Sequence, residues 1–165
     1  MKLPNTAPQY LQTHALMVVA AQEEGRIYRI ADGQVEHLET IEQHLEPLSD
    51  DEGFFFSGKH GGGSPKDRTD APEYLKALRR NLGHELNQRI KKDGIDVLYI
   101  FEPEHLKGRV GAELSPHPSL AVHQVRYGNY VQTPLKELID YITAYIDEHR
   151  IDLDTHEYRR DFAKF

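Results

Sequence analysis

The chain has 165 residues, a formal net charge of −7 and no cysteine. A chain of this length can bury one hydrophobic core unaided, and the lack of cysteine excludes disulfide frameworks, thiolate catalysis and cysteine-rich zinc sites. No apolar run reaches the roughly 20 residues that a membrane span needs, and no signal-peptide pattern opens the chain. We therefore expect a cytoplasmic protein with no membrane partner.

The first part of the chain predicts a tail followed by three strands. Residues 1–13 contain two prolines and no sustained period, which is typical of a flexible tail. The continuous apolar run His14–Ala21 predicts a strand buried on both faces, at the centre of a sheet. The runs Arg26–Ala31 and Gln34–Ile41 are separated by the turn signal Asp32-Gly33. We expect a meander of three antiparallel strands.

A glycine-rich stretch follows. The short run Phe54–Phe56 predicts either a fourth strand or a core anchor. Residues 57–69 can form no regular element, because three consecutive glycines maximise backbone freedom and Pro65 removes a hydrogen-bond donor. This stretch is expected to be an exposed loop, and its notable residues are Lys59, His60, Gly61, Gly62, Gly63, Ser64, Lys66 and Arg68.

A long helix is predicted after the loop. Asp70–Glu73 offers a side-chain acceptor, a proline in the first turn and a glutamate three residues on, which is a capping-box arrangement. Gly94 stands where a left-handed cap would end the helix. The apolar stripe has three- and four-residue spacing and consists of Leu75, Leu78, Leu82, Leu86 and Ile90.

The last part of the chain alternates strands and helices. Asp96–Phe101 predicts a strand parallel to an earlier one, because a helix intervenes. A short helix is expected over Pro103–Leu114, a strand over Leu120–Val125 and a second long helix over Pro134–Arg150. Residues 151–165 are charged and aromatic, which is typical of a C-terminal tail or a helical extension.

This order of elements predicts a single α/β domain over residues 14–150, with a mixed sheet of five or six strands covered by helices. Its charge is uneven. From Lys59 to Lys92 there are nine basic and four acidic residues, so this segment carries +5 and the remainder −12. Such asymmetry indicates either an oriented partner or a helix with solvated charges.

The glycine loop carries a family resemblance. Lys59–Ser64, between a meander and a basic helix, resembles the loop of the central domain of archaeal and eukaryotic peptide-chain release factors, where a glycine-glycine-glutamine triplet follows lysine, histidine and glycine. The strand and short helix of that domain are similar to Val97–Phe101 and Leu106–Leu114. Its last strand and glycine turn are similar to Val125–Asn129. The resemblance covers roughly residues 14–150. It extends to stand-alone bacterial and archaeal relatives, including host attachment proteins, and implies a ribonuclease H-like fold of translational machinery components.

The resemblance implies a ribosome-associated factor in translation rescue, dormancy or stress. The functional loop would consist of Gly61, Gly62, Gly63 and Ser64. The residues that contact RNA would be Lys59, His60, Lys66, Arg68, Arg79 and Arg80. The family's catalytic glutamine is replaced by Ser64, and Pro65 restricts that serine to extended conformations. Peptidyl-tRNA hydrolysis is therefore not expected, and neither is a cofactor.

Three alternatives stay open. The glycine loop is either an anion nest or a flexible linker. The protein is alternatively a non-catalytic module that binds a protein through its acidic surface. It is alternatively a metal-dependent nuclease, with Glu102 and Glu104 as the acids to inspect, although acids at a helix start have a plain explanation in the helix dipole. The ten histidines show no metal-binding spacing, so no metal site is predicted.

Overall fold

The computed structural model describes residues 1–3, 14–43 and 73–162, and in this part of the chain it has five strands. The elements in chain order are β1 (Ala15–Ala20), β2 (Glu24–Ala31), β3 (Gln34–Glu42), α1 (Glu73–Asp93), β4 (Val97–Glu102), the 3-10 helix η2 (Glu104–Leu106), α2 (Arg109–Ala112), β5 (Ala121–Tyr127) and α3 (Leu135–Phe162).

The strands form one mixed sheet in the order β3-β2-β1-β4-β5. β1 pairs antiparallel with β2, and β2 pairs antiparallel with β3. β1 pairs parallel with β4, and β4 pairs parallel with β5, as expected for strands joined through helices. The predicted mixed α/β sheet is confirmed with five strands, and the further candidate Phe54–Phe56 lies outside the described residues.

β1 is the central strand, and its sequence explains why. All six residues of Ala15–Ala20 are buried, because both faces of the strand are covered. A strand buried on both faces cannot alternate polar and apolar residues, which accounts for its continuous apolar run. The prediction of a buried central strand is confirmed.

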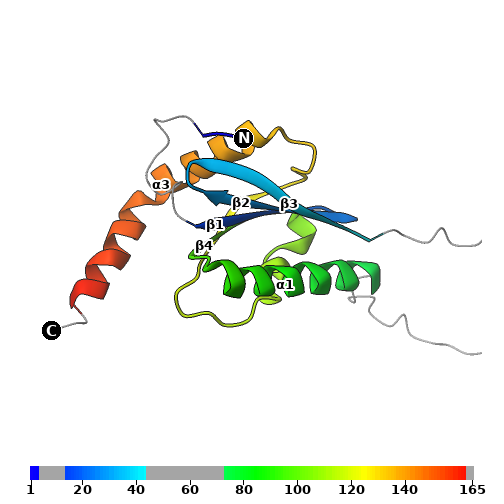
Figure 1. The fold of residues 1–165 in the computed structure, drawn as a ribbon, viewed down its shortest axis with the longest axis horizontal. Helices are drawn as coiled ribbons and strands as arrows, with labels where there is room; N and C mark the ends of the chain where they lie inside the picture. Colours follow the sequence, from blue (N-terminus) through cyan, green and yellow to red (C-terminus); the bar gives the residue numbers. More distant parts are fainter. Residues whose placement is uncertain (4–13, 44–72, 163–165) are drawn as a thin grey trace, which may run out of the picture.

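Helices cover the two faces of the sheet as separate layers (Figure 1). On one face, α1 and α2 pack on one side of β1 and β4, and the predicted α1 stripe is buried there: Leu75, Leu78, Leu82, Leu86 and Ile90. On the other face, α3 buries Leu138, Ile139, Ile142 and Ile146 against the opposite side of the same strands. The result is a three-layer α/β/α arrangement.

A β-bulge explains the imperfect alternation of β3. Ile27 pairs with Glu39 and Tyr28 with His37, so Leu38 is an extra residue in β3. An extra residue reverses which face the following side chains occupy. Val35 therefore packs in the α3-side core, whereas Ile41 packs in the core under α1.

The structure corrects one predicted helix and extends another. The segment Pro103–Leu114 is not one helix, because Gly108 has a left-handed backbone (φ 71°) that separates η2 from α2. α3 continues past Arg150 to Phe162, so the second of the two expectations for residues 151–165, a helical extension, holds up to Phe162, and the C-terminal half of α3 runs past the edge of the sheet (Figure 1).

The first residues of the chain pair with β3. The N-terminal ammonium of Met1 donates to the carbonyl oxygen of Val35 at 2.6 Å, and Lys2 forms a β-bridge with Gln34. Leu3 is buried in the α3-side core. The prediction of a flexible tail is thus wrong for residues 1–3, while residues 4–13 lie outside the described part.

Candidate nucleic-acid interface

The structure describes two of the predicted site residues. Arg79 and Arg80 lie in α1. The others lie outside the described residues and stay predictions: the loop residues Gly61, Gly62, Gly63 and Ser64, and the basic residues Lys59, His60, Lys66 and Arg68.

The two ends of the segment 44–72, which contains the glycine loop, are attached at one end of the sheet. β3 ends at Glu42, beside the amino end of β2, and the amide of Gln43 donates to the Glu23 carbonyl at 2.8 Å. α1 begins at Glu73 at the same end of the molecule (Figure 1). This is the carboxyl end of the parallel strands β1 and β4, where α/β sheets ordinarily place their ligands.

Arg79 and Arg80 have different environments. The Arg79 side chain is only 13% exposed, and its Nε lies 3.8 Å from a carboxylate oxygen of Glu113, next to α2. Arg80 is exposed on the outer side of α1. Since a phosphate contact requires an accessible guanidinium, Arg80 suits the predicted RNA contact and Arg79 suits a contact between helices.

The outer side of α1 carries a row of polar and basic residues at four-residue spacing. We call it the α1 row: Lys76, Arg80, His84, Gln88 and Lys92. Residues four apart lie on one side of a helix, so the row follows the helix axis. Lys76 is half-buried and the other four are exposed, and Gln88 and His84 are hydrogen-bonded at 2.8 Å. Lys91, beside the row, is exposed too.

Arg89 holds α1 against the sheet. Its guanidinium donates to a carboxylate oxygen of Glu39 on β3 at 2.9 Å and lies 2.6 Å from Glu85 in α1. Burial opposes the charge on Arg89, but the hydrogen bond that it donates to Glu39 and the attraction of Glu85 outweigh this and raise the pKa of the guanidinium. Arg89 is therefore compensated within the fold.

A close helix contact joins α1 to α2. A Cβ atom added to Gly83 would lie 2.5 Å from the Cβ of Glu113, so only glycine allows the two backbones to approach this closely. Asn87 links the same segments, since its amide donates to the Glu113 carbonyl at 3.1 Å and its oxygen accepts from the Ser115 amide at 2.8 Å. An isolated glycine within a helical pattern often has such a packing reason, and this signal was present in the sequence.

Glu102 is a fully buried carboxylate at the end of β4. It accepts hydrogen bonds from the backbone amides of Gly108 at 2.6 Å and Val110 at 3.3 Å. Burial raises the pKa of Glu102, and the two amide hydrogen bonds partly oppose this. The carboxylate therefore ties the start of α2 to the sheet, in agreement with the helix-start explanation, whereas Glu104 is exposed.

The opposite face, under α3, combines aromatic contacts with acidic charge. His123 lies between Tyr99 and Tyr145 (ring centroids 5.8 and 5.7 Å), and His149 stacks on Tyr145 at 4.2 Å. Burial, with a smaller contribution from the nearby His149, lowers the pKa of His123. The exposed acids of α3 up to residue 149 are Glu137, Asp140, Asp147 and Glu148.

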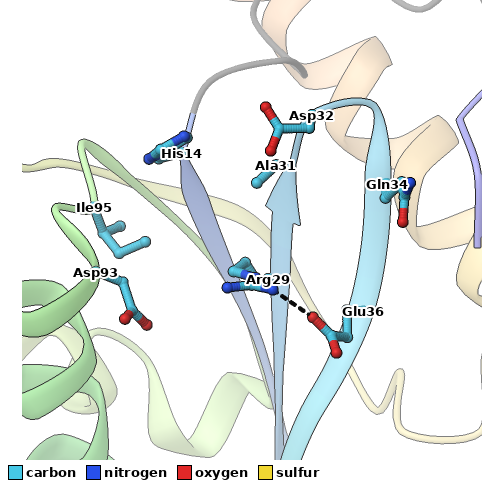
Figure 2. A pocket seen from close by; sticks show the side chains of 8 residues that line it. All are labelled: His14, Arg29, Ala31, Asp32, Gln34, Glu36, Asp93 and Ile95. Carbon is cyan, nitrogen blue, oxygen red and sulfur yellow. Dashed lines mark hydrogen bonds and ion pairs between the residues drawn. The ribbon is translucent and has the colours of Figure 1, made fainter.

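A pocket of about 310 Å³ lies at the other end of the sheet. His14, at the start of β1, and Asp93, at the end of α1, line it together with the β2–β3 hairpin, where Arg29 and Glu36 form an ion pair at 2.7 Å (Figure 2). It lies at the amino end of β1 and β4, far along α1 from Glu73. The pocket is therefore separate from the end where the glycine segment is attached.

Neither a metal site nor a membrane span is present among residues 1–3, 14–43 and 73–162. No three His, Asp or Glu side chains among them come close enough to hold a metal ion. None of their helices is long and apolar enough to cross a bilayer.

The likeness of the chain to known proteins is confined to solved structures. No protein-family model matches the chain, and no curated protein matches it. A chain of the ribosome-bound archaeal Pelota and ABCE1 structure matches with TM-score 0.50 and 13% identity, over 97% of this protein and 42% of that chain. The archaeal translation termination factor aRF1 matches with TM-score 0.40 and 10% identity, over 88% of this protein and 41% of that chain.

The chain thus spans well under half the length of the solved chains that it matches. At these identities the likeness concerns the fold alone. The likeness to the chain of the Pelota and ABCE1 structure agrees with the mixed α/β fold that the sequence predicts.

Sequence reasoning missed several surface residues near the carboxyl ends of β4 and β5. Lys107 and Arg109 are exposed on either side of Gly108, and Tyr127 is exposed at the end of β5. They are far apart in the sequence, so no local pattern joins them.

Proposed function

We propose that the protein is a ribosome-associated factor of the release-factor-like kind, acting in translation rescue, dormancy or stress. It presents the segment Lys59–Arg68 and the outer side of α1 to RNA. The observation that carries the proposal is the α1 row, which places cations along the exposed side of the helix that directly follows the glycine segment.

Electrostatics favours this orientation. α1 has six basic and three acidic residues, whereas α3 has four basic and eight acidic residues. A phosphate backbone is attracted to the α1 side and repelled from the α3 side. The similarity of the fold to a chain of a ribosome-bound complex supports the proposed association with ribosomes.

The protein is expected to bind without hydrolysing peptidyl-tRNA. Gly61–Gly63 would allow the backbone to approach RNA closely. Ser64 is shorter than the family's glutamine and precedes Pro65, so it does not place a water molecule in the same way. Release assays with programmed ribosomes test this, and efficient hydrolysis by the natural protein would contradict it.

Sedimentation of tagged protein with ribosomes tests the binding. At low salt the natural protein should sediment with ribosomes, and binding should weaken as salt rises because phosphate contacts release counterions. Arg80→Glu with Lys92→Glu should weaken binding strongly and lower the slope of log K against log salt by roughly 0.7–0.9 per lost contact. Lys136→Glu, a single charge reversal at an exposed position of α3, is the control for Arg80→Glu alone and should bind normally.

A second candidate is a protein-interaction module. The four exposed acids of α3 motivate it, because they form a surface suited to a basic protein partner. A stable complex without RNA, insensitive to nuclease and to charge reversal at Arg80 but lost on Asp140→Lys with Asp147→Lys, would favour this candidate. The nuclease alternative gains no argument from the described residues, since Glu102 is committed to backbone amides.

A further inference from the structure

A second group of exposed cations lies at the start of α2. α2 packs directly on α1 at Gly83 and Asn87, so the start of α2 belongs to the same helical layer. Lys107 and Arg109 are exposed there. Among the described residues, no carboxylate forms an ion pair with either of them. Glu104, three residues before Lys107, is exposed, and Glu113, four residues after Arg109, lies 3.8 Å from Arg79 instead.

An exposed aromatic ring borders these cations. Tyr127, the last residue of β5, is 39% exposed, and the Lys107 ammonium lies 5.2 Å from its ring centroid. Lys107 belongs to the segment leading into α2, so this ring lies on the α1/α2 side of the sheet. The neighbouring Arg126 faces the other side, where its guanidinium lies 4.1 Å from the Tyr141 ring of α3.

Glu102 fixes this arrangement. Its carboxylate holds Gly108 and Val110, and its carbonyl accepts from the Gly128 amide at 2.9 Å. The same buried residue therefore sets the positions of the chain on both sides of the surface: the Lys107–Arg109 segment and the end of β5. A surface held by buried hydrogen bonds is preorganised for a ligand.

We propose that Lys107, Arg109 and Tyr127 form a binding surface for single-stranded RNA. The Tyr127 ring stacks on a base, while Lys107 and Arg109 contact the flanking phosphates. Exposed aromatic rings next to cations suit single strands, since the bases of a duplex are already stacked on each other. The inference rests on the proposed function and adds the class of RNA and the residues that read it.

Fluorescence anisotropy with a labelled single-stranded RNA oligonucleotide, and with the corresponding duplex, tests this surface. Tyr127→Ser should weaken single-strand binding by about 5- to 150-fold, as expected for one lost stacking contact, and leave duplex binding within about twofold. Tyr127→Phe should bind normally, because it keeps the ring. Arg109→Ser should lower the salt slope by about 0.7, and Lys136→Ser on α3 should not.

The outcomes separate this inference from the proposed function. Tyr127→Ser that binds the single strand as tightly as the natural protein overturns the stacking surface. If that variant also sediments normally with ribosomes, the proposed function is kept and only the single-strand binding surface is overturned. A natural protein that binds neither RNA nor ribosomes overturns both. Circular dichroism of each variant verifies that the fold is kept.

Discussion

The α1/α2 face and the α3 face of the sheet have the same construction inside and opposite charge outside. Each helix buries an apolar stripe against β1 and β4. The outer side of α1 is basic, whereas α3 is acidic. Because the inner stripe determines packing and the outer side faces solvent, fold and partner choice are carried by different residues of the same helices. Substitutions can therefore separate the two.

The largest effect is expected from emptying either core. Leu86→Ala in α1 and Ile142→Ala in α3 each remove a fully buried side chain, and each should lower the free energy of unfolding by about 2–5 kcal/mol. Urea denaturation followed by circular dichroism measures both. A cost below about 1 kcal/mol for only one of them would mean that the two layers are not equivalent in packing.

A smaller loss is expected at the contact between α1 and α2. Alanine is a better helix former than glycine by about 1 kcal/mol, but Gly83→Ala should still destabilise the protein by about 1–3 kcal/mol, because its methyl group meets Glu113. Asn81→Ala, on the exposed side of the same helix, should stay within about 0.5 kcal/mol. A stabilised Gly83→Ala protein would show that α2 can move away freely.

Glu102 should give the α1/α2 face its own pH dependence. Its pKa is raised in the folded protein, so the native state binds the proton more tightly than the unfolded chain does. Its contribution to stability is present below the ordinary carboxyl pKa of 4.5 and is lost as pH rises through the raised pKa.

Thermal unfolding at several pH values measures this contribution. Glu102→Gln should remove the loss of stability that occurs as pH rises through the raised pKa, and should change stability little at neutral pH. Glu102→Ala should cost about 1–3 kcal/mol, because the amides of Gly108 and Val110 lose their acceptor. Equal pH profiles for the natural protein and Glu102→Gln would contradict the raised pKa.

The smallest effect is expected on the α3 face and has the opposite sign. The pKa of His123 is lowered from 6.5, so its contribution is present above pH 6.5 and is lost as pH falls through the lowered value. His123→Gln should reduce this acid-side loss. His149→Gln should reduce it less, because burial is the larger cause of the shift. The same titration of thermal midpoints distinguishes them.

The sequence predicted those parts of the fold that depend on local periodicity. β1, the meander and the apolar stripe of α1 all follow from residue spacing, and each is confirmed. The Leu38 bulge and the break at Gly108 were missed, because each depends on how one segment pairs with its neighbour and not on the spacing of residues within a segment. A glycine pattern alone does not reveal which backbone will bend.

The candidate site was only partly predictable. The basic character of α1 could be read from the sequence, but the division between accessible Arg80 and half-buried Arg79 required the position of Glu113 on α2. The surface around Tyr127 depends on β5 lying beside β4, so its members come from separate segments. The glycine loop itself stays a prediction.

The central position of β1 has a consequence for the order of folding. β1 pairs with β2 through residues close in the chain, such as Ala15 with Ile30, but it pairs with β4 through distant residues, such as Ala15 with Val97. During synthesis the meander is complete well before β4 emerges. Until then the edge of β1 that pairs with β4 has no partner strand. Long-range parallel pairing is slow, and an exposed apolar edge favours aggregation. β1, the most buried strand of the folded sheet, is thus the element most prone to aggregation while the chain is still being synthesised.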